Sequence, residues 1–160
     1  MDWLGIHTTR LNAHLVRTIF RDLARPHIIE HYDEKVDIGD YPIIVGSGWK
    51  PGWSTDYCAV SMAKNYGAQT VINMSNTDGV YTADPRKDTS ATRIDKINWK
   101  EYRTMFGSEW TPGLSAPIDP IAARLSDEMG LTIITLNGKN FENLENAIKG
   151  QEFVGTRITK

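Results

Sequence analysis

From residue 41 onward, short apolar segments alternate with segments that have the end signals of capped helices. The strand candidates cover residues 41–48, 69–74, 131–138 and 153–159. The helix candidates between and beside them cover residues 55–68, 98–107, 119–130 and 140–150. An order of this kind predicts an α/β fold in which a largely parallel sheet carries helices on its faces.

The first forty residues add one long helix and one short strand. Apolar residues recur there at steps of seven and four, at Leu4, Leu11, Leu15, Ile19 and Leu23. This spacing predicts an amphipathic helix that begins near Asp2 and ends before Pro26. Residues 27–30 read as a short strand, and residues 69–74 read as a buried one.

Length and composition exclude several classes of protein. A chain of 160 residues suits a single domain that spans residues 1–160. The formal net charge of -2 provides no basic field for nucleic acid. No apolar run approaches the ~18 residues of a membrane-spanning helix. The one cysteine, Cys58, cannot form an internal disulfide, which suits a reducing compartment. We therefore expect a cytoplasmic protein without a nucleic-acid or membrane partner.

The loop at residues 46–56, "GSGWKPGWSTD", follows a predicted strand and opens a predicted helix. Its three glycines allow positive φ and close approach of a ligand to backbone amides. Free N–H groups at the helix start suit an anion such as phosphate, Lys50 adds a positive charge, and Trp49 and Trp53 offer flat surfaces for a base. The spacing matches neither common phosphate-loop motif. On spacing alone, a plain turn before a capped helix with two partly buried tryptophans explains the loop equally well.

The loop at residues 77–88, "TDGVYTADPRKD", follows the next predicted strand. Ligands of open α/β sheets bind beyond the carboxyl ends of the strands, so both loops fall where a ligand is expected. Tyr81 suits packing on a flat ring, and Asp84 suits a ribose or a metal. Arg86 and Lys87 either meet phosphate or face water. From composition alone, a charged connection in solvent is the favoured interpretation.

Other candidate residues give weaker signals. The histidines have no paired arrangement that would predict a protein-bound metal; they are His7, His14, His27 and His31. Asp119 precedes a proline at a predicted helix start, where an N-cap is the simplest role. No arrangement of nucleophile and base follows from spacing.

Taken together, the segments resemble a known family. The loop at residues 77–88 resembles the nucleotide-binding loop of the amino-acid kinase superfamily, and the loop at residues 46–56 resembles the UMP-holding loop of archaeal-like uridylate kinases. Three further segments match uridylate kinases in the same order: "GIHTTRLNA", "IDPIAA" and "NLENAIKGQEFVGTRI". The resemblance covers essentially the whole chain.

The resemblance implies a three-layer αβα sandwich and an activity. Relatives use ATP, with Mg²⁺ bound to the nucleotide, to phosphorylate UMP to UDP in pyrimidine nucleotide biosynthesis. They form homo-oligomers, hexamers built from dimers, with the first helix in the dimer contact. The resemblance assigns UMP binding to Asp2, Trp49, Lys50, Pro51, Gly52, Trp53, Ser54 and Thr55. It assigns ATP binding to Ser75, Tyr81 and Asp84, and catalytic roles to Asp56 and Asp119.

The start of the chain departs from the family pattern. Relatives place a strand, a lysine and a glycine-rich phosphate loop ahead of the first long helix, whereas this sequence opens directly on that predicted helix. We therefore expect an N-terminally incomplete domain, the C-terminal two-thirds of a kinase domain, with little activity alone. The alternative is a non-catalytic nucleotide- or oxyanion-binding protein on the same fold. A kinase for another acceptor, such as carbamate, an amino acid or an isoprenoid phosphate, is a third interpretation.

Overall fold

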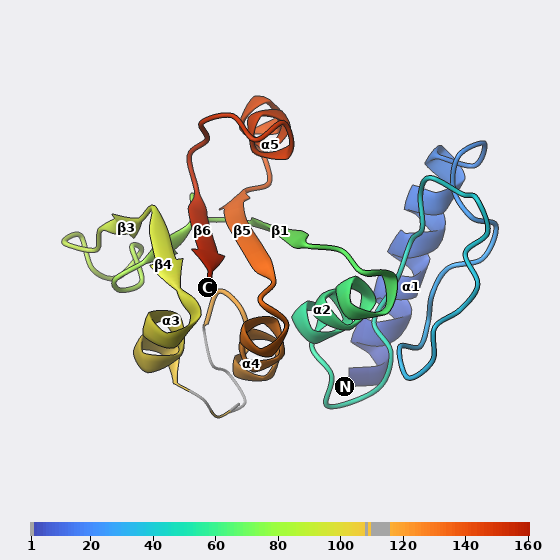
Figure 1. Cartoon of the computed structure of the whole chain (residues 1–160), viewed down its shortest axis with the longest axis horizontal. Coiled ribbons are helices and arrows are strands. Elements are labelled where there is room, and N and C mark those ends of the chain that lie inside the picture. The colour runs from blue at the N-terminus through green and yellow to red at the C-terminus, as the bar shows by residue number, and fades with distance from the viewer. Residues whose placement is uncertain (1, 108, 110–115) are drawn as a thin grey trace. The chain divides into compact units, whose positions relative to one another are not determined.

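The computed structural model describes residues 2–107, 109 and 116–160, and the chain divides into two compact units (Figure 1). The first unit is Met1–Gly67 and the second is Ala68–Lys160. Each unit has its own buried residues and is described by itself.

Two helices and two extended segments form the first unit. The helices are α1 (Asp2–Ile19) and α2 (Thr55–Tyr66). The strands predicted at residues 27–30 and 41–48 are present only as isolated parallel bridges, one of which pairs Ile29 with Gly46. The Ile29 amide donates to Val45 O at 2.8 Å, and the Ser47 amide donates to Ile29 O at 3.0 Å. These two bonds align the segments but do not form a continuous ladder, so the prediction of full strands was wrong.

The predicted helix at the start of the chain is confirmed as α1, but its apolar stripe is not buried. Leu4, Leu11 and Ile19 are 74%, 70% and 67% exposed. Only Ile6 and Ala13 of this helix are buried. The face that packs on the rest of the unit is therefore a different one from the face that the leucines mark.

A small aromatic core holds the first unit together. It contains Ile29, Tyr32 and Cys58, with partly buried hydrophobic side chains packed against it: Val36, Trp49, Trp53 and Met62. Both predicted ends of α2 are confirmed. The Ser54 hydroxyl accepts a hydrogen bond from the Tyr57 amide, and Gly67 ends the helix in the left-handed conformation at φ 72°.

The second unit contains a four-stranded sheet in the order β1-β5-β6-β4. The strands are β1 (Thr70–Ser75), β4 (Lys96–Asn98), β5 (Thr132–Asn137) and β6 (Thr156–Thr159). The β1–β5 and β4–β6 pairs are parallel, whereas β5 and β6 are antiparallel. The predicted α/β fold with a largely parallel sheet is confirmed. β1 is an edge strand rather than the expected buried one, with Met74 51% exposed.

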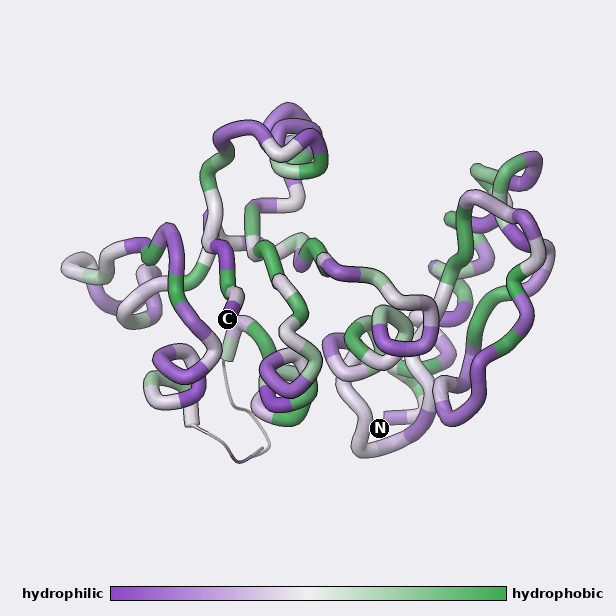
Figure 2. The backbone as a smooth tube through the Cα atoms, viewed as in Figure 1, coloured by the Kyte–Doolittle hydropathy of each residue, from purple (hydrophilic) through white to green (hydrophobic). Residues whose placement is uncertain are grey.

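Three helices accompany this sheet: α3 (Trp99–Phe106), α4 (Pro120–Met129) and α5 (Phe141–Ile148). Helix α3 lies against β4 and β6, α4 lies against α3, and α5 lies against β5. Hydrophobic residues recur along β5, as Figure 2 shows. Ile134 and Leu136 form a core with Ala147 of α5, and Ile133, one residue out of phase, is buried on the other face. The sheet is thus covered on both faces.

A two-stranded hairpin, which the sequence did not predict, completes the second unit. It pairs β2 (Val80–Tyr81) with β3 (Arg93–Ile94). The buried Thr156 of β6 joins both strands, because its hydroxyl accepts from the Val80 amide at 2.7 Å and donates to Ile94 O at 2.5 Å. Gly79 makes this approach sterically feasible, since a Cβ there would lie 2.6 Å from the Thr156 hydroxyl oxygen.

Candidate functional site

A cavity of about 260 Å³ opens between α1 and the loop at residues 46–56 of the first unit. The helix contributes Asp2, Gly5, Ile6 and Thr9 to its wall, and the loop contributes Gly48, Lys50, Pro51, Trp53 and Thr55. A second hollow of about 190 Å³ shares Thr9, Gly48 and Thr55 with this cavity and extends to Cys58 and Met62 of α2. The first unit therefore brings five of the predicted UMP-binding residues together at one cavity.

Because two of its glycines have no side chain, the loop can approach the Thr9 and Tyr32 hydroxyl groups closely. The Gly48 amide donates to the Thr9 hydroxyl at 2.9 Å, and a Cβ on Gly48 would lie 2.9 Å from that same oxygen. A Cβ on Gly46 would lie 2.7 Å from the Tyr32 hydroxyl oxygen. Of the three loop glycines only Gly52 has a positive φ, 82°. The positive φ that glycine allows is thus used only at Gly52, whereas close packing is the constraint at Gly46 and Gly48.

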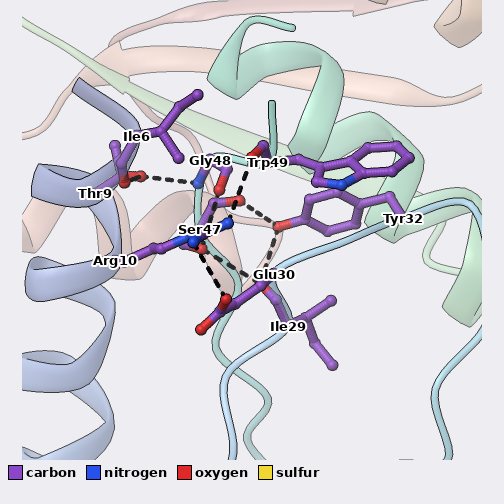
Figure 3. A network of polar contacts seen from close by, with 9 residues as sticks. All are labelled: Ile6, Thr9, Arg10, Ile29, Glu30, Tyr32, Ser47, Gly48 and Trp49. Atoms are coloured by element: carbon purple, nitrogen blue, oxygen red, sulfur yellow. Dashed lines mark hydrogen bonds and ion pairs between the residues drawn. The ribbon is translucent and has the colours of Figure 1, made fainter. Parts of the chain in front are cut away.

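Tyr32 holds the start of the loop through its hydroxyl group, which points toward Ser47 (Figure 3). Its hydroxyl donates to Ser47 O at 2.6 Å, and the Ser47 hydroxyl lies 3.2 Å from Gly48 O. Burial raises the pKa of Tyr32 far above its ordinary value, and the nearby Cys58 thiol raises it further. The phenol is therefore a neutral donor at physiological pH.

The two loop tryptophans have different surroundings. Trp49 packs edge-on against Tyr32, with ring centroids 6.3 Å apart, and edge-on against Trp53 at 4.4 Å. Trp53 in turn contacts Tyr57 at 4.3 Å and lines the cavity, whereas Trp49 lies outside the cavity lining. The Lys50 ammonium lies 3.8 Å from the Trp49 ring centroid. Cation–π attraction thus holds a positive charge at the cavity wall.

The remaining loop residues shape the turn and the helix start. The Trp53 amide donates to Lys50 O at 3.2 Å and closes the turn that contains Gly52. Ser54 is the cap of α2, and Asp56 is half-buried in its first turn. Gly52, Ser54 and Asp56 lie outside the described lining of the 260 Å³ cavity.

The predicted ATP-binding residues all belong to the second unit. Ser75 ends β1, and its hydroxyl lies 3.2 Å from that of Thr77. Tyr81 is half-buried on β2. The Asp84 carboxylate accepts hydrogen bonds from the Arg86 amide at 3.0 Å and from its guanidinium at 3.1 Å. The side-chain bond from Arg86 is the main cause that lowers the pKa of Asp84.

Arg86 therefore pairs with a carboxylate instead of only facing water or meeting phosphate, although its side chain is 65% exposed. The Asp84–Arg86 pair spans two residues and closes the turn that follows β2. Asp84 consequently has a local structural role in addition to the nucleotide contact expected of it.

Asp119 is the buried N-cap of α4. One carboxylate oxygen accepts from the Ile121 amide at 2.8 Å and from the Ala122 amide at 3.0 Å. The predicted capping role is confirmed, with Pro120 at the first helical position and Gly130 as the left-handed stop.

The described residues provide neither a cluster of metal ligands nor a membrane-spanning helix. No group of three or more histidines, cysteines, aspartates or glutamates gathers within residues 2–107, 109 and 116–160 in a way that suits a metal ion. Across the same ranges, no helix has the length and apolar character needed to cross a bilayer.

Sequence reasoning missed four residues of the cavity wall. Gly5, Ile6 and Thr9 follow Asp2 at three, four and seven residues, the spacing of one helix face, so that spacing could have identified them. The fourth, Gly48, belongs to the glycines that the sequence marks for close approach of a ligand, but its contact with Thr9 spans 39 positions and no spacing indicates it.

Comparisons with known proteins point in one direction. The model of the amino acid kinase family matches residues 1–137. The uridylate kinase of Methanospirillum hungatei is 32% identical, over 99% of this chain and 68% of that protein. The uridylate kinase of Natronomonas pharaonis is 35% identical, over 99% of this chain and 70% of that protein.

A solved structure gives the same picture. The crystal structure of uridylate kinase from Archaeoglobus fulgidus superimposes with a TM-score of 0.83 at 32% identity, over 99% of this chain and 71% of that one.

Proposed function

The chain belongs to the amino acid kinase family as a phosphotransferase of its uridylate kinase branch, and we propose that it transfers the γ-phosphoryl group of ATP to UMP. A phosphate oxygen of UMP attacks the γ-phosphorus, the bond to the β-phosphate oxygen breaks, and UDP and ADP leave. In such transfers the protein contributes mainly positioning and charge stabilisation.

The observation that carries this proposal is the cavity of the first unit. It combines a carboxylate, an ammonium group, an indole and a hydroxyl, from Asp2, Lys50, Trp53 and Thr55. A nucleoside monophosphate presents matching groups, because its ribose hydroxyls donate to a carboxylate, its phosphate needs positive charge and its base packs on a flat ring. We propose that Asp2 binds the ribose, Lys50 and Thr55 the phosphate, and Trp53 the uracil.

The other predicted residues receive supporting roles in the proposal. Trp49, Pro51, Gly52 and Ser54 shape the loop that carries the direct contacts. Asp56, half-buried at the start of α2, orients cationic groups near the reacting phosphates. Asp119 acts at the edge of the reaction site while capping α4.

We propose that the second unit binds ATP through Ser75, Tyr81 and Asp84. A half-buried phenol beside a turn fits the flat face of adenine, and a carboxylate fits ribose hydroxyls. The Asp84 carboxylate retains accepting capacity beyond its bonds to Arg86, since two oxygens offer about four lone-pair sites. Magnesium carried by ATP would supply charge neutralisation at the phosphates.

A coupled assay of ADP release tests the proposal, with UMP, CMP and AMP as separate acceptors. UMP should be turned over much faster than the other two. Equal rates with all three would exclude UMP specificity. Calorimetry with UMP and ATP on the same preparation separates a binding protein from a kinase, because heat without ADP release would mean a non-catalytic nucleotide-binding protein.

Matched tryptophan variants test the acceptor side. Trp53→Leu should raise the KM for UMP and leave the KM for ATP unchanged. Trp3→Leu is the control, because Trp3 is 55% exposed on α1 and stacks only on His7 among the described rings. An equal rise of both KM values in Trp53→Leu would count against a base contact.

We also propose that the chain forms a homo-oligomer through α1. This helix exposes a row of large apolar side chains: Leu4, Leu11, Leu15 and Ile19. Rows of this kind are typical of protein contacts. Light scattering after gel filtration should give a mass above that of one chain, and Leu11→Lys should reduce it to one chain. A monomer in the unmodified protein would exclude the proposal.

A further inference from the structure

Arg10 connects three segments of the first unit, as Figure 3 shows. From α1, one terminal nitrogen lies 3.4 Å from a Glu30 carboxylate oxygen, and the other lies 3.4 Å from Trp49 O, to which it donates. The Arg10 side chain is only 24% exposed. A partly desolvated guanidinium with two partners fixes geometry more strongly than an exposed ion pair, because its rigid fork must satisfy both at once.

Consecutive residues of the helix hold consecutive residues of the loop. Thr9 accepts from the Gly48 amide, and Arg10 donates to the Trp49 carbonyl. Lys50 follows directly, and its ammonium rests on the Trp49 ring. Arg10 does not line the cavity, so it acts on the ligand only through the loop.

We infer that Arg10, with Glu30 as its counter-ion, is a positioning residue that fixes the loop at residues 46–56, which carries the proposed UMP contacts, against α1. The inference rests on the proposed function, in which Lys50 and Trp53 bind UMP. Loss of the guanidinium frees the Trp49 carbonyl, and the loop then spends part of its time with Lys50 and Trp53 displaced from the cavity wall. The acceptor site loses affinity, whereas the ATP site in the other unit does not.

Hydrogen exchange on the ligand-free chain tests, without any nucleotide, whether Arg10 holds the loop in place. Arg10→Gln should raise exchange of the hydrogen-bonded amides within residues 48–53, those of Gly48 and Trp53, about tenfold, the equivalent of one lost charged hydrogen bond. Exchange in the middle of α2 should not change. Arg21→Gln is the control, because Arg21 pairs with Asp22 where both side chains are at least 75% exposed. Unchanged exchange at residues 48–53 in Arg10→Gln would overturn the inference.

Calorimetry then tests the consequence for binding. Arg10→Gln should raise the Kd for UMP about tenfold and leave the Kd for ATP unchanged. Because one ion pair is shared, the Arg10→Gln/Glu30→Gln double variant should bind UMP no more weakly than Arg10→Gln alone. Arg10→Lys should fall between the wild type and Arg10→Gln, since lysine keeps the charge without the fork.

These measurements distinguish a failure of the Arg10 inference from a failure of the proposed function. A mobile loop with an unchanged Kd for UMP would overturn the positioning role. If the unmodified chain binds no UMP, the proposed function fails, while the exchange rates still decide whether Arg10 holds the loop. If Arg10→Gln does not fold, Glu30→Gln and Arg10→Lys provide the same two comparisons, and wild-type values in both would overturn the inference.

Discussion

The Thr9 hydroxyl accepts a hydrogen bond from the Gly48 amide at 2.9 Å and donates its own proton to Ile6 O at 2.7 Å. The hydroxyl proton is therefore used in a hydrogen bond within α1, and the hydroxyl oxygen accepts a hydrogen bond from the loop. This one side chain ties the two walls of the cavity together.

Gly48→Ala should disturb this contact. The added Cβ would lie 2.9 Å from the Thr9 hydroxyl oxygen, too close for an unshifted structure. We expect the free energy of unfolding to fall by about 1–3 kcal/mol, as for other overpacked sites, and UMP binding to weaken. Urea unfolding and calorimetry measure the two effects.

A second substitution checks the cause. Thr9→Ala removes the oxygen that a Cβ on residue 48 would meet, so the double variant should lose less stability than the two single losses added together. Strict additivity would show that the clash lies elsewhere. Gly5→Ala is the control for stability, because nothing lies within 4 Å of a Cβ there and alanine favours the helix.

Tyr32→Phe should reveal the buried phenol in its pH dependence. At pH 7 the variant should be less stable by about 1–2 kcal/mol, because Ser47 O loses its 2.6 Å hydrogen bond. Burial raises the pKa of Tyr32 in the folded protein, so its contribution is complete below the ordinary tyrosine pKa and is lost as pH rises toward the folded value. The gap between wild type and variant should therefore narrow above pH ~10.

Urea unfolding at a series of pH values measures this gap. Tyr41→Phe is the control, since Tyr41 is 44% exposed. A gap for Tyr32→Phe that stays constant from neutral to strongly alkaline pH would contradict the assignment.

The turn after β2 should loosen in acid. Arg86 lowers the pKa of Asp84, so the pair stabilises the turn above the ordinary aspartate pKa and is lost as pH falls through the lower, folded value. We expect the Asp84 carboxyl signal in an NMR titration to move to higher pKa in Arg86→Gln. Asp88, whose pKa is lowered chiefly by a hydrogen bond from Ser90, should not move. Equal movement of both aspartates would point to a general charge effect.

Asp119 variants can separate its cap from its proposed part in the reaction. Asp119→Ala should lower the free energy of unfolding of the chain by about 1 kcal/mol, the usual loss of an N-cap. Asp119→Asn should keep nearly full stability, because asparagine caps as well as aspartate. If Asp119→Asn is stable yet transfers phosphate much more slowly, the negative charge serves the reaction. If Asp119→Asn is as unstable as Asp119→Ala, the capping account fails.

Local chemistry explains which elements could be predicted. The ends of α2 and α4 follow from Ser54 and Gly67 and from Asp119 and Gly130, because caps depend on neighbouring residues alone. The Asp84–Arg86 pair also joins residues that are close in the sequence, two positions apart, so it could have been anticipated from this spacing.

Features that depend on distant partners could not be read in this way. The β2 and β3 strands have two residues each, too few for any periodicity, and Thr156, far along the chain, holds them. Arg10 and Glu30 are separated by twenty positions, with no pattern that relates them. The α1 leucines are a further example. Their spacing correctly predicted a helix, but it did not reveal which face of that helix packs on the rest of the unit.

The Thr156 hydroxyl, which reaches both strands of the hairpin, has a consequence for protein engineering. Both ends of the segment between β2 and β3 are fastened to the sheet at the same point. Loop closure costs little more as a flexible segment grows, so residues inserted there should leave the sheet undisturbed. The segment beyond Asp84, at residues 88–91, is therefore a suitable place to introduce a fluorescent label or a short epitope.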